Sequence, residues 1–294
     1  MNPVLVEIPM PFGWNSLQIR YYGLMYVVAI LVGIWLTRRL AARRGLPLTL
    51  DDILDFVLMT VPVAIVGARL YYVAFQWSSF YVPGNLWQTF INIIAIWEGG
   101  LAIHGGILAG LLMLWVFCRV KRVPFWAFAD AVAPSMILGQ ALGRFGNFMN
   151  GDAYGTPIGP EWPAWLDWVG VVYAPGTPGH QQWGHIPTHP TMLYEMAGDL
   201  MIFGILLWLG RQNFQDGFIT ALYAILYSVL RFGIEFLRAD ALWLIPDTLR
   251  AAHVISVLFI VIFGGLIFWK KLYTRRLVEA PSVAPQGEGQ SVSG

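Results

Sequence analysis

Three groups of polar residues interrupt long apolar segments of this 294-residue sequence and have side chains that could carry chemistry. The first is the block from Gly143 to Gly155, where Arg144, Asn147 and Asn150 are interleaved with four glycines. Arginine without a neighbouring lysine favours a planar anion such as phosphate, because a guanidinium can form two parallel hydrogen bonds with it. Asparagine amides and free backbone N–H groups beside Arg144 would complete a site for an anion.

The second group is a stripe of Tyr227, Arg231 and Glu235, spaced four residues apart. This spacing places the three side chains on one face of a helix. Two interpretations stay open for the stripe. Arg231 binds an anion, or Arg231 and Glu235 form an internal ion pair that needs no ligand.

The third group contains histidines. His104 precedes Gly105 and Gly106 at the start of an apolar segment. A histidine titrates near neutral pH and is the most common general base, so His104 is a candidate for proton transfer. A hydrogen-bonded histidine in a protein core is the alternative. His189 and Glu195 form a further cluster at the start of a later apolar segment, where they could equally cap a helix or lie at an interface.

Composition determines the class of protein in which these residues lie. The chain is 57% hydrophobic and 12% charged, and its mean hydropathy is +0.61. Soluble domains are about half apolar and about a quarter charged, so the sequence predicts an all-α integral membrane protein. The net charge of +1 gives no electrostatic reason to expect a nucleic-acid partner. Cys118 is the single cysteine, which excludes an internal disulfide, and no spacing indicates a metal site or another cofactor.

Seven segments are long and apolar enough to be membrane spans, since a bilayer core of about 30 Å needs roughly 20 mostly apolar residues per helix. The start of the chain lacks the basic region of a signal peptide, so the first span is expected to be retained. Ile91–Ile96 is a further short apolar run, expected to be interfacial or re-entrant. The seven expected spans are Tyr21–Leu36, Ile53–Phe75, Gly100–Phe117, Phe125–Leu142, Thr191–Leu209, Gly217–Phe236 and Ala251–Trp269.

Basic residues predict the orientation of these spans. Cytoplasmic loops carry an excess of lysine and arginine, so we expect the N-terminus outside and the C-terminus in the cytoplasm. Twelve of the 18 cations follow the odd-numbered spans: Arg38, Arg39, Arg43, Arg44, Arg119, Lys121, Arg122, Arg211, Lys270, Lys271, Arg275 and Arg276.

The remaining six cations are all arginines, and Arg20 and Arg250 are expected at the outer ends of helices. The other four lie within or near the outer halves of spans, where a charge faces a partner or a water-filled cavity. Anion binding and internal pairing both stay open for them, and anion binding is favoured most at Arg144. These four are Arg69, Arg144, Arg231 and Arg238.

Two further expectations concern segments outside the spans. The glycines and asparagines of residues 143–155 are expected to open the backbone at the outer end of the fourth span, and such irregular backbone must be buried in protein or line a cavity. Residues 150–190, rich in Trp, Pro and Gly, are expected to form a small extracytoplasmic cap between spans four and five. Residues 1–278 would then be one transmembrane catalytic domain, and 279–294 a disordered cytoplasmic tail.

The motifs together resemble the prolipoprotein diacylglyceryl transferase family. The resemblance covers roughly residues 20–270, and the block from Gly143 to Gly155 is similar to the family signature at nearly every fixed position. It departs at Asp152, where the family usually has glutamate. The other motifs that carry it are Tyr22-Gly23-Leu24-Met25-Tyr26, His104-Gly105-Gly106, His189-Pro190 with Tyr194-Glu195, and Tyr227, Arg231, Glu235 and Arg238.

The resemblance implies a bacterial inner-membrane enzyme that catalyses the first step of lipoprotein maturation. Such an enzyme moves the diacylglyceryl group of phosphatidylglycerol to the lipobox cysteine of a preprolipoprotein, forms a thioether and releases glycerol-1-phosphate. It also implies that Arg144 and Arg231 hold the phospholipid head group and that His104 is a base or a positioning group. The remaining residues expected to shape the lipid site are Tyr22, Asn147, Asn150, Gly155, Tyr227 and Glu235.

Other functional classes fit the sequence less well. A transporter or channel could line an anion path with arginines, but duplicated halves are not evident. A retinal-type receptor is excluded because all three lysines are expected in the cytoplasm. A structural scaffold would not need four arginines near the hydrocarbon. Among enzymes, another phospholipid head-group transferase is the nearest alternative.

Overall fold

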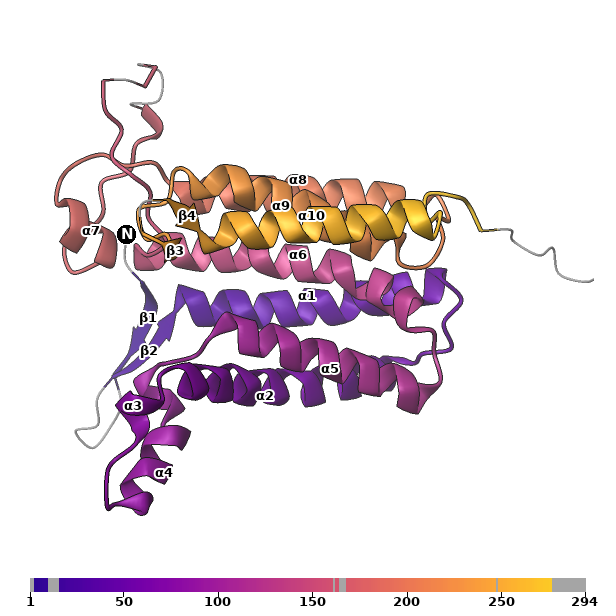
Figure 1. The fold of residues 1–294 in the computed structure, drawn as a ribbon, viewed down its shortest axis with the longest axis horizontal. Helices are drawn as coiled ribbons and strands as arrows, with labels where there is room; N and C mark the ends of the chain where they lie inside the picture. Colours follow the sequence, from indigo (N-terminus) through magenta and orange to yellow (C-terminus); the bar gives the residue numbers. More distant parts are fainter. Residues whose placement is uncertain (1–2, 10–15, 161, 164–167, 247, 277–294) are drawn as a thin grey trace, which may run out of the picture.

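The computed structural model describes residues 3–9, 16–160, 162–163, 168–246 and 248–276. The expected tail, residues 279–294, lies outside the described residues. Seven described helices are long and apolar enough to cross a membrane, which confirms the prediction of seven spans. Figure 1 shows them side by side in one bundle: α1 (Tyr21–Arg43), α2 (Leu50–Phe75), α5 (Ile103–Lys121), α6 (Phe125–Asn150), α8 (Thr191–Leu209), α9 (Phe218–Glu235) and α10 (Ala251–Trp269).

Helix α6 differs from the sequence-based expectation. The fourth span was expected to end near Leu142 and to give way to open backbone, but the helix continues to Asn150 and ends at Gly151, whose φ is +69°. The glycines serve close packing instead. A Cβ on Gly146 would lie 2.3 Å from Cδ2 of Tyr22, so only glycine allows the Tyr22 ring of α1 to lie against α6. The backbone N–H groups in this part of α6 are therefore used within the helix.

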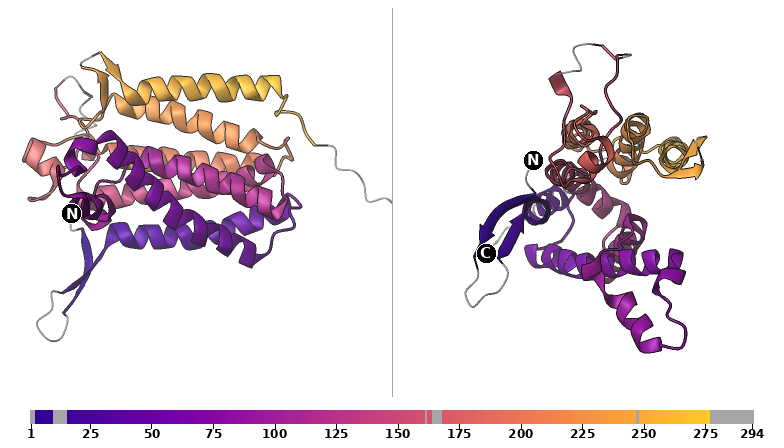
Figure 2. Two further views of the ribbon diagram at one scale, coloured as in Figure 1. Left: turned by 60° about the horizontal axis from the view of Figure 1, so that its bottom comes forward. Right: turned by 90° about the vertical axis from the view of Figure 1, so that its left-hand side faces the viewer.

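The bundle is organised around α6, which contacts α1, α5, α8 and α9. Helix α10 packs on α9, and α2 packs on α5. The last pair is close because a Cβ on Gly105 of α5 would lie 2.2 Å from the carbonyl oxygen of Gly67 on α2. The right-hand view of Figure 2, along the bundle, shows α9 with α10 and α2 with α5 as two separate projections from the centre.

Two buried hydrophobic clusters join these helices. One cluster connects α2 and α5 to α6 and includes Phe56, Phe117 and Phe128, whose ring centroids lie 5.0 to 5.2 Å apart. The other connects α6 to α8 and α9 through residues such as Ile137 and Leu206. The first cluster lies where α2 and α6 begin and α5 ends, so it joins the α2–α5 pair to α6 at one end of the bundle.

The basic residues gather at that same end, which we name the basic end. It contains the C-terminal ends of α1, α5, α8 and α10, all on the right in Figure 1. Lys121 at the end of α5 pairs with Asp52 at the start of α2, where Thr49 and Asp52 form a capping box. The expectation that the twelve cations share one side of the bundle agrees with this arrangement.

The opposite end, which we name the site end, contains the short elements (Figure 1). The expected interfacial run Ile91–Ile96 falls in α4 (Leu86–Ile94) and the 3-10 turn η2 (Ile96–Glu98), both too short to span a membrane. Two antiparallel hairpins also lie here: β1 (Val4–Ile8) with β2 (Leu17–Arg20), and β3 (Trp243–Ile245) with β4 (Leu249–Arg250). The remaining helices are α3 (Trp77–Phe80) and α7 (Pro178–Trp183).

The connection between α6 and α8 is folded onto the site end in its described parts. Thr188 bridges both Pro157 and Val171 in antiparallel fashion. Tyr173 is 2% exposed, and its hydroxyl donates to Sδ of Met192 across 3.8 Å. Burial raises the pKa of Tyr173 to about 12, in keeping with its packed position.

Candidate functional site

An ion pair between Arg144 and Glu195 forms the centre of the site. Arg144 lies on α6, nearly two turns before its end, and Glu195 lies in the first turns of α8. Nη2 of Arg144 donates to Oε1 of Glu195 across 2.6 Å. The Glu195 side chain is 1% exposed, whereas that of Arg144 is 20% exposed. The guanidinium therefore has a buried partner on one side and an accessible surface on the other.

Arg231 of α9 reaches the same carboxylate. Its Nη1 lies 4.0 Å from Oε2 of Glu195, and its Nη2 lies 2.7 Å from Oε2 of Glu235. Tyr227, one turn earlier on α9, donates its hydroxyl to Oε1 of Glu195 across 3.2 Å. The stripe on α9 thus forms the internal ion pair that was one of its two interpretations, and it also joins Arg231 to Arg144 through Glu195.

Glu235 is held in place from a second direction. The side chain of Arg250, which precedes α10, donates to the carbonyl oxygen of Glu235 and lies over the ring of Trp243, 4.7 Å from its centroid. Arg250 thus lies at a helix end, as expected. Glu235 itself is 1% exposed. The backbone of the residue whose carboxylate binds Arg231 is therefore held by Arg250 at the end of α9.

The end of α6 contributes two amides. Nδ2 of Asn147 donates to Oδ1 of Asp152 across 2.6 Å. Burial raises the pKa of Asp152, and the hydrogen bonds from Asn147 and Asn150 oppose that shift. Among the described residues, Oδ1 of Asn150 has no hydrogen-bond partner although it is buried. An unpaired buried acceptor of this kind is uncommon in folded proteins, and here it lies at the end of the helix that carries Arg144.

Gly155 and Tyr22 take part in the framework of the site. Gly155 forms an antiparallel bridge with Arg238, which follows α9 and binds Asp240 through two hydrogen bonds of 2.8 and 2.7 Å. Tyr22 packs on Gly146 of α6, and its hydroxyl accepts a bond from Tyr26 across 3.0 Å. These contacts join α1, α6 and the segment after α9 around the arginine pair.

His104 is not part of the arginine cluster in this structure. It lies in the first turn of α5, at the site end, with an exposed side chain. Its contact within the described part of the chain is with the ring of Tyr71 on α2, whose centroid lies 5.9 Å away. The role of His104 as a base or a positioning group therefore stays a prediction.

Arg69 has a structural role that the sequence left open. Its side chain on α2 is buried and donates five hydrogen bonds, all to backbone carbonyl groups, and its guanidinium also lies over the ring of Phe80. It holds the segment between α3 and α5 against α2. The accepting carbonyls belong to Asn92, Ile93, Ala95, Gly99 and Gly100.

Sequence reasoning did not select two acidic residues that belong to the site. Glu195 was left open as a member of a polar cluster or a capping or interfacial group, and Asp199 was not considered. Asp199 lies one turn after Glu195 on α8 and is fully buried. Neither of its carboxylate oxygens has a hydrogen-bond partner among the described residues. The spacing of Glu195 and Asp199, four residues apart in an apolar helix, was the signal that could have indicated them.

The arrangement is suited to binding an anion that competes with a carboxylate. Two partly exposed guanidiniums from α6 and α9 share one buried acid, so a phosphate at their exposed side would meet donors already held in position. Within the described residues, no group of three His, Cys, Asp or Glu side chains could hold a metal ion.

Comparison with known proteins is consistent with this geometry. The family model described as prolipoprotein diacylglyceryl transferase matches residues 9–269. The chain is similar to proteins named phosphatidylglycerol--prolipoprotein diacylglyceryl transferase from two bacteria. The Geobacillus kaustophilus protein is 42% identical over 84% of this chain and 87% of its own length. The Nostoc protein is 40% identical over 98% of this chain and 94% of its own length. The chain therefore belongs to the prolipoprotein diacylglyceryl transferase family.

Proposed function

We propose that this protein transfers the diacylglyceryl group of phosphatidylglycerol to the lipobox cysteine of preprolipoproteins, the first step of bacterial lipoprotein maturation. One observation carries this assignment: Arg144 and Arg231, from two different helices, meet at the buried carboxylate of Glu195. Membership of the transferase family supports the same reaction.

The proposed reaction is an alkyl transfer. The substrate thiol loses its proton, and its sulfur attacks the glycerol carbon that carries the phosphate. A carbon–sulfur bond forms as the carbon–oxygen bond breaks, and the electron pair of that bond leaves with glycerol-1-phosphate. The nucleophile comes from the substrate, so the enzyme needs no reactive cysteine. Its own Cys118 is buried near the basic end of α5.

Arg144 and Arg231 would stabilise the leaving group. The phosphate gains negative charge as the carbon–oxygen bond breaks, and donors aimed at developing charge lower the barrier. When phosphate binds, Arg144 would exchange part of its contact with Glu195 for contact with the phosphate oxygens. Tyr227 holds the carboxylate of Glu195 in place, Glu235 holds Arg231, and Asn147 and Asn150 offer amides to the glycerol head group.

His104 is proposed as the group that accepts the thiol proton or positions the thiol. A free thiol has a pKa of about 8.5, so at neutral pH a base is needed to produce much thiolate. His104 lies at the same end of the bundle as Arg144 and is exposed, so an incoming peptide could reach it.

The proposal also includes the orientation and the domain organisation. The basic end would face the cytoplasm because cytoplasmic loops are rich in arginine and lysine. The N-terminus would then lie outside the bacterial inner membrane and the C-terminus inside. Residues 150–190 would form an extracytoplasmic cap that guides the lipobox segment, within one transmembrane catalytic domain of residues 1–278. Reporter fusions after Gly45, Pro124 and Gly294 should all report the cytoplasm.

The decisive experiment uses purified protein, phosphatidylglycerol and a lipobox peptide, with products identified by mass. The peptide should gain glycerol and both fatty acids through a thioether that survives neutral hydroxylamine, and glycerol-1-phosphate should appear in equal amount. A peptide with serine in place of cysteine is the matched control. Release of lysophospholipid, or a label removed by hydroxylamine, would show that the protein is an acyl transferase instead.

A further inference from the structure

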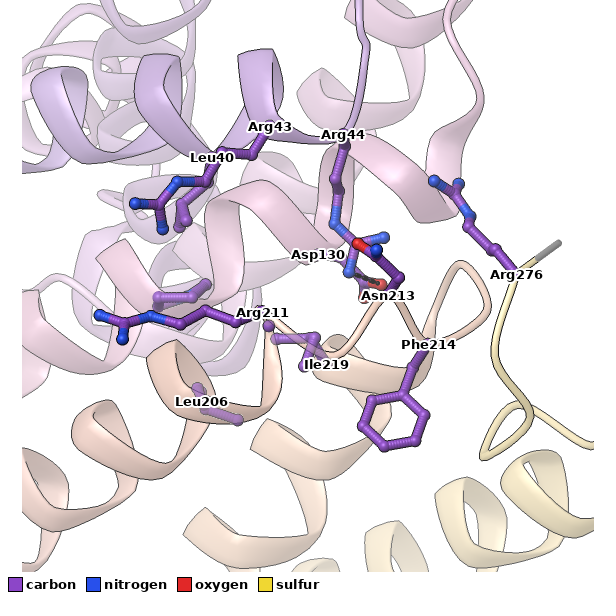
Figure 3. Close-up of a pocket in the computed structure, with 12 residues that line it drawn as sticks. Leu40, Arg43, Arg44, Asp130, Leu206, Arg211, Asn213, Phe214, Ile219 and Arg276 are labelled. Atoms are coloured by element: carbon purple, nitrogen blue, oxygen red, sulfur yellow. Dashed lines mark ion pairs between the residues drawn. The ribbon is translucent and has the colours of Figure 1, made fainter. Parts of the chain in front are cut away.

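A cavity of about 280 Å³ lies at the basic end, far from Arg144. Figure 3 shows the side chains that line it, which come from the end of α1, from α6, from α8 and α9 with the connection between them, and from Arg276 after α10. Along α1, the 21 residues from Tyr22 to Arg43 correspond to about 31 Å. The cavity is therefore separate from the site described above.

Two arginines of the cavity are neutralised by acids, one of them buried and the other partly exposed. Arg44 pairs with Asp130 at 2.8 Å and with Asp216 at 2.9 Å, and Arg276 also pairs with Asp216. Asp130 is fully buried, and it also accepts hydrogen bonds from the backbone of Gly217 and from Thr220. Both carboxylates are thus already occupied by partners.

Two further arginines of the cavity have no such partner. The side chains of Arg43 and Arg211 are exposed, and within the described residues neither forms an ion pair or a hydrogen bond. Figure 3 shows both guanidiniums extending to the same side of the cavity. Four arginines line the cavity or its rim against the two carboxylates of Asp130 and Asp216, which leaves two positive charges uncompensated.

Most of the rest of the wall is apolar, with Asn213 as a polar exception. Leu40, Pro134, Leu206 and Ile219 line the cavity beside the arginines. Paired guanidiniums are suited to the oxygens of a phosphate group, and an adjoining apolar wall at a membrane surface is suited to an acyl chain. Basic pockets between transmembrane helices at this level bind the head groups of anionic lipids.

We propose that Arg43 and Arg211 form a second phosphate-binding site, separate from the site at Arg144, that takes a phosphate group carried by an anionic phospholipid or by a soluble phosphate ester. The apolar wall favours the lipid. A bound phosphate would connect the end of α1 to the connection after α8, and so would hold these parts of the bundle together through the ligand.

The test compares wild-type protein with the R43Q/R211Q variant, reconstituted in phosphatidylcholine nanodiscs with increasing amounts of phosphatidic acid. Native mass spectrometry counts the bound lipids. Wild-type protein should retain one more phosphatidic acid molecule than the variant, and the apparent Kd for that molecule should be about tenfold weaker or more in the variant. Arg38→Gln is the matched control, because Arg38 is an exposed arginine of α1 that does not line the cavity.

A further measurement distinguishes an anionic phospholipid from a soluble phosphate ester as the ligand. Inorganic phosphate at millimolar concentration, added to protein in a neutral detergent, should bind wild-type protein measurably only if a soluble ester suffices. Equal lipid retention by wild-type protein and the R43Q/R211Q variant would overturn the site, and so would an equal loss in the Arg38→Gln control. Circular dichroism verifies that the variant is folded. Transfer activity at saturating phosphatidylglycerol should be unchanged, since neither arginine belongs to the proposed catalytic site.

Discussion

Glu195 accepts a hydrogen bond of 2.6 Å from Arg144, although the two residues belong to different helices and lie 51 positions apart in the chain. The carboxylate is buried, and it also receives the hydroxyl of Tyr227. An acid in this position holds two arginines in place, and a phosphate would compete with it for their donors. This relationship leads to the first two predictions.

Arg144→Lys and Arg231→Lys should each reduce transfer about tenfold or more, although both keep the positive charge. A lysine cannot reproduce the two parallel hydrogen bonds of a guanidinium, and loss of one charge-assisted bond costs about 1.5–3 kcal/mol. Initial rates with purified variants test this, and Arg20→Lys, at the exposed start of α1, is the control. Near-normal turnover by both variants would show that these arginines have only a structural role.

Glu195→Gln should strengthen the binding of glycerol-1-phosphate about tenfold, or about 1.4 kcal/mol. Without the competing carboxylate, Arg144 loses its charged partner and Arg231 keeps only Glu235, so both guanidiniums can bind phosphate more strongly. The inhibition constant of glycerol-1-phosphate against transfer measures this effect directly. Because a buried ion pair is broken, the variant should also melt at a lower temperature. An inhibition constant that is unchanged or weaker would mean that Glu195 does not compete with phosphate.

His104→Gln should reduce transfer strongly at neutral pH and recover part of it as the pH rises toward 9. A higher pH ionises more of the substrate thiol, so the reaction depends less on a base. Measurement of kcat/KM for the lipobox peptide between about pH 6.5 and about pH 9 tests the prediction. If the ratio of variant to wild-type rate does not change with pH, His104 positions the peptide and does not accept its proton.

Arg69→Met should destabilise the protein without acting on the phosphate directly. The substitution leaves five backbone carbonyls without their donor, which costs about 3 kcal/mol or more. Thermal unfolding followed by tryptophan fluorescence should show a clear loss, whereas Arg119→Met, an exposed arginine of α5, should melt like the wild type. A melting temperature equal to that of the wild type would contradict the structural role of Arg69.

The seven spans and the one-sided distribution of cations could be predicted because both depend on local composition, which hydropathy and charge measure directly. The pairing of Arg231 with Glu235 was also predictable, since four-residue spacing determines contact on a helix. The role of Glu195 was not predictable, because its partner lies on another helix and the tertiary fold determines which helices are neighbours. The extent of α6 was missed because the glycines of its last turns suggested open backbone. Helix packing against Tyr22 outweighed their low helix propensity.

The attachment of α2 and α5 to α6 at the basic end has a mechanical consequence for the opposite end. From the cluster at Phe117 to His104, α5 extends about 20 Å. The α2–α5 pair is therefore attached at the basic end and can rotate about that attachment. A rotation of about 10° at the attached end would move His104 by about 3.5 Å, slightly more than the length of a hydrogen bond, with little disturbance of the cluster. Spin labels attached to cysteines that replace Leu108 and Leu200, in a Cys118→Ser background, should therefore give a broad distribution of label-to-label distances. A single narrow distance would instead show that the α2–α5 pair does not rotate and that His104 is fixed relative to Arg144.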